Sequence, residues 1–153
     1  MPNNFRLGKV NSKFVNSKSY KNLRNIIVAT SIIFMLVYAF RGSLYGLNNQ
    51  LITLFAETAP NLIFSFLFTL LGMFFALPFY KNIDPISNPM LIWIINALNI
   101  IISLLIEYIH VVLDLASWDN NDIVASIIGI VLSTAIYFKL RESFIDTYNK
   151  NEE

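Results

Sequence analysis

The residues best suited to chemistry gather between positions 107 and 126. Glu107, His110, Asp119, Asp122 and Ser126 bring carboxylate, imidazole and hydroxyl groups to one region of a chain that is 56% hydrophobic and only 14% charged. Such groups bind a cation or share a proton. Glu107 gives the strongest signal, because an ionisable side chain within an apolar helix is costly and marks a functional site by default.

Binding is a better prediction for these residues than catalysis. No set of nucleophile, base and orienting group is recognisable, so catalysis stays open. Glu-x-x-His spacing arises often by chance, and we predict neither a bound metal nor a cofactor. Asp119 also fits a capping box before an apolar run, and that alternative stays open. Arg41, outside this region, is the expected counter-charge for Glu107 or Glu57.

A stripe of polar residues runs along the apolar stretch 90–113 at steps of three and four. At 3.6 residues per turn these residues share one helix face. Lipid does not solvate them, so the face must turn toward other helices or water. We predict that the residues before Glu107 form interhelical hydrogen bonds and that Glu107 marks a site. The stripe consists of Asn96, Asn99, Ser103, Glu107, His110 and Asp114.

The neighbouring apolar stretches carry matching faces of small and polar residues. Small residues at this spacing let two helices approach closely. We predict that both faces pack against the helix at 90–113, in a bundle whose polar interior opens outward. The faces are Asn61, Ser65, Thr69, Gly72 and Ala76 on one stretch, and Asp122, Ser126, Gly129 and Ser133 on the other.

Four apolar stretches are long enough to position these residues across a bilayer, which takes roughly 20 residues of helix. They cover about 26–45, 61–80, 90–113 and 123–139. Pro60 and Pro89 are expected in first helical turns, where a missing N–H costs nothing. The predicted fold class is therefore all-α, an integral membrane bundle of four transmembrane helices. The predicted domains are a basic polar N-terminal tail at 1–24, the transmembrane domain at 25–140 and a short polar C-terminal tail at 141–153.

The distribution of Lys and Arg predicts the direction of the spans. With four spans, ten of the 11 Lys and Arg residues fall on one side, and only Arg41 falls on the other. Positive residues stay inside, so both termini are predicted to be cytoplasmic. The absence of cysteine excludes disulfides and thiolate metal sites. Nucleic-acid binding is not expected, because the basic tail lacks aromatic residues arranged for stacking.

The stretch from Glu107 to Gly129 resembles the VanZ-like membrane proteins, a family of small helical bundles whose namesake is associated with teicoplanin resistance in bacteria. Family members carry an intramembrane Glu followed at fixed intervals by Gln, Arg, an Asp-x-x-Asp pair, Asn and Gly. The matching positions are Glu107, His110, Ala116, Asp119, Asp122, Ser126 and Gly129. The chain thus has His for the Gln, Ala for the Arg and Ser for the Asn. Because the chain lacks that Arg, either Arg41 takes its place or the chemistry of this site differs from that of the family. The resemblance extends over roughly 60–133.

The resemblance implies a multi-pass protein of the bacterial cytoplasmic (inner) membrane that binds a lipid or cell-wall-precursor head group at an outward-facing acidic pocket. The expected ligand-binding residues are Glu107, His110, Asp119, Asp122, Ser126 and Arg41. One alternative is a non-catalytic membrane subunit or assembly factor. Another is a small oligomeric proton-coupled transporter with Glu107 and His110 as relay groups. Expected partners are membrane lipids, with a membrane-protein partner or a homo-oligomer as further candidates.

Overall fold

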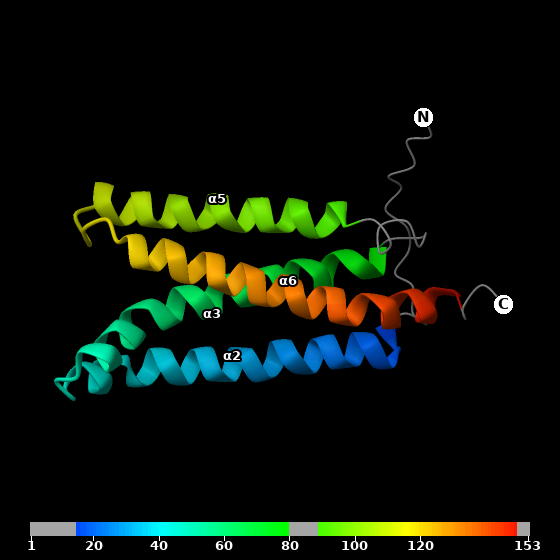
Figure 1. The fold of residues 1–153 in the computed structure, drawn as a ribbon, viewed down its shortest axis with the longest axis horizontal. Coiled ribbons are helices and arrows are strands. Elements are labelled where there is room, and N and C mark those ends of the chain that lie inside the picture. Colours follow the sequence, from blue (N-terminus) through cyan, green and yellow to red (C-terminus); the bar gives the residue numbers. More distant parts are fainter. Residues whose placement is uncertain (1–14, 80–88, 150–153) are drawn as a thin grey trace.

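The computed structural model describes residues 15–79 and 89–149, and these residues form helices and connections without any strand. Figure 1 shows four long helices running along one axis. The elements are α2 (Lys18–Tyr45), α3 (Gln50–Ala76), the short 3-10 helix η1 (Leu77–Phe79), α5 (Met90–Val112) and α6 (Asn120–Asn149). The outer parts of both predicted tails, and most of the connection before α5, lie outside the described residues.

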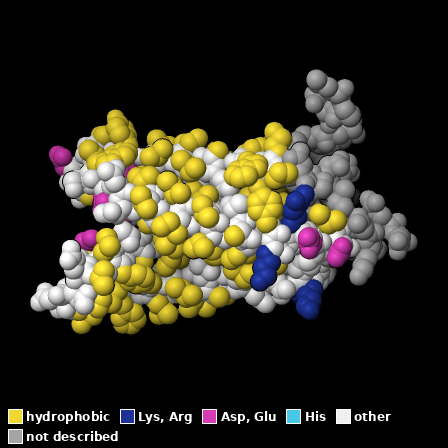
Figure 2. All heavy atoms as spheres, in the orientation of Figure 1, with side chains coloured by type: hydrophobic (Ala, Val, Ile, Leu, Met, Phe, Trp, Pro, Cys, Tyr) yellow, Lys and Arg dark blue, Asp and Glu magenta, His cyan; other side chains and the backbone are white. Residues whose placement is uncertain are grey.

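All four long helices are long and apolar enough to cross a membrane. Large apolar side chains remain exposed along their flanks, among them Leu36, Ile101 and Val131. Figure 2 shows this apolar surface on the sides of the bundle, with charged side chains gathered at its two ends. Such a surface suits hydrocarbon rather than water. The predicted all-α fold with four apolar helices is confirmed, and it is that of a multi-pass membrane protein.

Helix α2 begins eight residues before the predicted span. The side chain of Ser17 caps it by accepting a hydrogen bond from the N–H of Tyr20. Tyr20 and Leu23 are buried, and the Tyr20 ring stacks on Phe74 with 4.5 Å between centroids. Lys18 to Arg24 thus belong to a packed helix rather than to a tail. Because most of these residues are polar, the sequence did not indicate that one face of this segment is buried.

Helix α3 begins at Gln50, well before the predicted start at 61. Asn49 caps it, because its Oδ1 accepts hydrogen bonds from the N–H groups of Leu51 and Ile52 at 3.0 and 3.3 Å. Pro60 therefore lies inside the helix, and its predicted place in the first turn is wrong. A proline there removes one helical hydrogen bond, a cost that the surrounding packing offsets.

Helix α6 continues to Asn149, ten residues past the predicted end of the last span. Tyr137 and Phe144 are almost fully buried in the core. The hydroxyl of Ser143 shares a hydrogen bond with that of Ser19 on α2. These contacts explain why the described part of the predicted C-terminal tail is helical. By contrast, α5 agrees with its prediction to within one residue.

Helix α3 is central, and it crosses the bundle obliquely between α2 and α5 (Figure 1). Its tightest contact is with α6, where a Cβ on Gly129 would overlap the backbone carbonyl of Leu62. The small-residue face of α6 therefore packs against α3, and not against α5 as predicted. Gly72 of α3 does face α5, because a Cβ there would lie 2.9 Å from Cγ2 of Ile95.

Candidate functional site

The polar stripe of α5 begins as a ladder of interhelical hydrogen bonds. Asn99 has no exposed surface, and its amide donates to the Ser65 carbonyl at 2.6 Å and to the Thr69 hydroxyl at 2.9 Å. Asn96 donates to Thr134 of α6 at 2.9 Å. The hydroxyls of Ser65 and Ser103 lie 3.3 Å apart. The predicted interhelical hydrogen bonds are confirmed, so this part of the stripe holds α3, α5 and α6 together.

Glu107, one step further along the stripe, is only 5% exposed and turns away from the lipid-facing surface. Its Oε1 accepts a 2.7 Å hydrogen bond from the backbone N–H of Asp119. The chain reaches this position through a tight turn after α5, in which the N–H of Leu115 donates to the His110 carbonyl and Asp114 has a positive φ of 54°. The loop before α6 thereby folds back over Glu107 and fixes one of its two oxygens.

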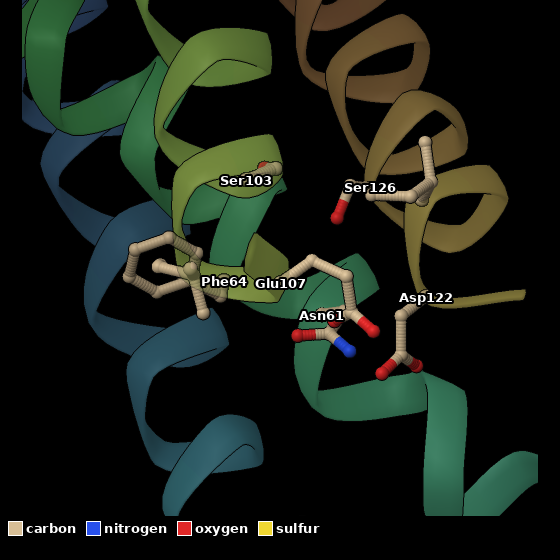
Figure 3. Close-up of a pocket in the computed structure, with 8 residues that line it drawn as sticks. Asn61, Phe64, Ser103, Glu107, Asp122 and Ser126 are labelled. Atoms are coloured by element: carbon tan, nitrogen blue, oxygen red, sulfur yellow. The ribbon is translucent and has the colours of Figure 1, made fainter. Parts of the chain in front are cut away.

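A pocket surrounds Glu107 at the end of the bundle where α5 ends and α6 begins. Figure 3 shows the side chains of Asn61, Glu107 and Asp122 converging on it from three helices. Its empty volume is about 260 Å³ with the open mouth included, and the enclosed part has room for about one water-sized group. The lining residues are Asn61, Phe64, Ser103, Ile106, Glu107, Asp122, Ile123 and Ser126.

Several polar atoms of this pocket have unused hydrogen-bonding capacity. Asp122 Oδ1 is buried without a hydrogen-bond partner. Ser126 is only 5% exposed, and its hydroxyl bonds to no described residue. Oε2 of Glu107 likewise has no hydrogen-bond partner within 15–79 and 89–149. Of these three atoms only Asp122 Oδ1 is fully buried, and a buried polar atom is nearly always satisfied in a folded protein, so its lack of a partner beside two further unbonded acceptors points to a bound group.

Asp119 contributes to the pocket through its backbone rather than its side chain. Its Oδ1 accepts a 2.8 Å hydrogen bond from the N–H of Asn121 in the first turn of α6. This contact is the capping role that the sequence left open. The carboxylate still acts electrostatically on Asp122. Asp119 does not line the pocket.

Two other predicted site residues lie away from the pocket lining. His110 is half-buried near the end of α5 and is absent from that lining. Arg41 donates from Nε to the Tyr45 hydroxyl at 2.8 Å, and its guanidinium lies 5.6 Å from the centre of the Tyr45 ring. Among the described residues it forms no ion pair with Glu57 or Glu107, but it acts on Asp122 at longer range.

The structure brings together Glu107, Asp122 and Ser126 of the predicted set. It adds Asn61, which lies close enough to interact with the Asp122 carboxylate. The sequence placed Asn61 only on a packing face. Its step of four residues to Ser65 was a signal that it belongs to the polar interior. The part of the chain that the structure describes holds no group of three His, Cys, Asp or Glu residues arranged for a metal ion.

The chain was compared with protein families, curated proteins and solved structures. No protein-family model, curated protein or solved structure matches the chain. The resemblance to the VanZ-like family therefore rests on the sequence alone, where the spacing from Glu107 to Gly129 is kept and four of the seven positions (Glu107, Asp119, Asp122 and Gly129) have the family's residue.

Proposed function

We propose that this chain is a VanZ-like protein of the bacterial cell envelope that binds the head group of a lipid or of a lipid-linked cell-wall precursor. The ligand binds in the pocket beside Glu107, on the outer side of the cytoplasmic membrane. One observation carries the proposal. Glu107 is 5% exposed, yet only one of its oxygens is bonded within the described chain, and the other lies in a pocket with further unpaired polar atoms.

The position of the pocket suits a lipid head group. It lies at the end of two helices that are long enough to span a bilayer, which is where head groups begin. Trp118, in the loop beside it, is 48% exposed, as an interfacial anchor would be. The head group of a lipid in that leaflet would therefore lie at the level of the pocket.

The charge distribution supports an outward orientation. Figure 2 shows the Lys and Arg side chains of this face only at the end where α2 begins and α6 ends, whereas acidic side chains lie at both ends. Positive residues favour the cytoplasmic side, so both termini lie inside and the pocket lies outside.

The interior beyond the pocket favours binding over transport. Asn99, Ser65 and Thr69 are fully buried and hydrogen-bonded to one another across α3 and α5. They fill the centre of the bundle where a transport path would have to run. Glu107, Asp122 and Ser126 contact the ligand, and the Asp119 N–H orients Glu107. No bond-making step is part of this proposal.

Lipids that co-purify with the protein test the proposal. Wild type, Glu107→Gln and Asp122→Asn should be purified from bacterial membranes, and their retained lipids quantified by mass spectrometry. Glu57→Gln is the matched control, because it removes a carboxylate from α3 that does not line the pocket. We expect one lipid class to be retained by wild type and control and to be depleted at least about tenfold in the two pocket variants. Identical lipid profiles in all four proteins would contradict the proposal and favour a packing or assembly role.

A further inference from the structure

The pocket offers hydrogen-bond acceptors and negative charge, with no cationic residue in its lining. Asp122 Oδ1 is buried without a hydrogen-bond partner, and Glu107 Oε2 and the Ser126 hydroxyl, which also line the pocket, have no partner among the described residues. Lys, Arg and His are absent from the lining residues. Figure 3 shows the Glu107 and Asp122 carboxylates on opposite helices, with the Ser126 oxygen directed between these helices. A phosphate or another anion would therefore meet repulsion here.

Ser126 is the most informative of these groups. Two other hydroxyl residues of α6, Ser133 and Thr134, donate back to the carbonyl of Ile130 at 2.9 and 2.7 Å, as helical hydroxyls commonly do. Ser126 makes no such bond, although only 5% of its surface is exposed. The Ser126 hydroxyl makes no hydrogen bond within its own helix and lines the pocket, so it is available to a ligand.

The like charges around the pocket favour a positive partner. Glu107 and Asp119 both act on the Asp122 carboxylate as like charges. Arg41 opposes them only at a distance, since its guanidinium is bonded to Tyr45. Two partly buried carboxylates without a close cation are costly, and a positively charged ligand relieves that cost.

We infer that the group bound in the pocket is a primary ammonium, held by Glu107 Oε2, Asp122 Oδ1 and the Ser126 hydroxyl. The inference rests on the proposed function and names the chemistry of its ligand. An ammonium nitrogen carries three N–H donors on one centre, one for each of these acceptors. A quaternary ammonium has no N–H and is recognised by several aromatic faces, whereas Phe64 is the one aromatic residue of the lining. A planar guanidinium matches a flat pair of oxygens rather than three acceptors from two helices.

Head-group selectivity tests the inference directly. Purified protein is incubated with phosphatidylethanolamine, phosphatidylcholine or phosphatidylglycerol that carry identical acyl chains, and bound lipid is counted by native mass spectrometry. Three lost charge-assisted hydrogen bonds predict a preference of at least about tenfold for the ethanolamine lipid over the choline lipid. Glu107→Gln and Ser126→Ala should reduce that preference, while Glu57→Gln should leave it unchanged. Ser126→Ala removes a single hydroxyl, so it keeps the test valid if Glu107→Gln does not fold.

A second experiment tests whether the bound ammonium belongs to a lipid head group or to a soluble amine. Wild type in phosphatidylcholine nanodiscs is titrated with ethylamine, and its thermal unfolding midpoint is recorded. A rise that Ser126→Ala abolishes supports the ammonium site. If ethylamine binds and none of the three lipids does, the ligand is a free amine. If only the ethanolamine lipid binds, the ligand is a lipid head group.

The two proposals fail in different ways. Equal binding of the choline and ethanolamine lipids, both dependent on Glu107, would overturn the ammonium inference and leave head-group binding intact. Binding that disappears on addition of EDTA would also overturn it, because a divalent cation would then fill the pocket. Lipid binding that is unchanged in Glu107→Gln and Asp122→Asn would overturn both proposals.

Discussion

At the scale of single residues, the polar groups of α5 divide between structure and binding. Asn99 has a structural role, because its fully buried amide donates to the Ser65 carbonyl and the Thr69 hydroxyl of α3. Glu107 lies two turns further along, where one of its oxygens has no described partner. The same helix face therefore stabilises the bundle at its centre, where Asn99 donates two hydrogen bonds although its Oδ1 has no partner, and presents the Glu107 carboxylate to the pocket at its end.

This division predicts that Asn99→Ala destabilises the protein. The substitution removes two interhelical hydrogen bonds, and we expect a loss of about 1–2 kcal/mol in the free energy of unfolding. Titration with SDS in mixed micelles, followed by circular dichroism, measures it. Asn121→Ala is the matched control, because Asn121 is exposed and donates only its backbone N–H. Equal stability of the two variants would show that the ladder contributes nothing.

At the scale of helices, the contact between α3 and α6 depends on a missing side chain. Gly129 lies against the backbone of α3, where a Cβ would overlap the Leu62 carbonyl and approach the Phe66 nitrogen to 3.0 Å. Backbone atoms cannot move aside as the end of a flexible side chain can. The helices must therefore separate to admit even one methyl group. Since Asp122 and Ser126 lie on α6 and Asn61 on α3, their separation would also widen the pocket.

Gly129→Ala should thus lower the stability by about 2 kcal/mol or more, as overpacking does, and weaken lipid binding together with it. Gly42→Ala provides the control. A Cβ at Gly42 meets nothing within 4 Å, so alanine there should be neutral or stabilise α2 by up to about 1 kcal/mol. Thermal unfolding of both variants in detergent measures the difference. A wild-type midpoint for Gly129→Ala would mean that α3 and α6 are not in such close contact.

At the scale of the whole molecule, the orientation of the bundle decides which compartment the pocket faces. The chain has no cysteine, so single cysteines can report its topology without background. We expect Asn48→Cys and Ser117→Cys to react with an impermeant maleimide in intact cells, because both lie at the end poor in Lys and Arg. Glu142→Cys should react only after permeabilisation. The opposite pattern would place the pocket in the cytoplasm and exclude a ligand from the outer leaflet.

Much of the fold could be predicted because hydrocarbon places strict demands on a sequence. Apolar runs of sufficient length indicated four helices, and the period of 3.6 showed that Asn96, Asn99 and Glu107 share a buried face. Helix ends were predicted less well. The start of α3 depends on a single cap at Asn49, and the extension of α6 depends on the burial of Phe144 among residues distant in sequence. Such contacts leave no periodic signal.

By itself the sequence determined the class of the protein and the carboxylate around which a site could form, because the cost of burying polar groups in lipid is local to each helix. The tertiary structure decided which helices meet and which polar atoms remain unpaired. It gave the Asp119 carboxylate a capping contact, left His110 and Arg41 outside the pocket lining, and added Asn61. Those outcomes depend on the crossing of α3 with α6 and on one tight turn after α5. Both arise from packing between segments far apart in the chain, which spacing along one helix does not encode.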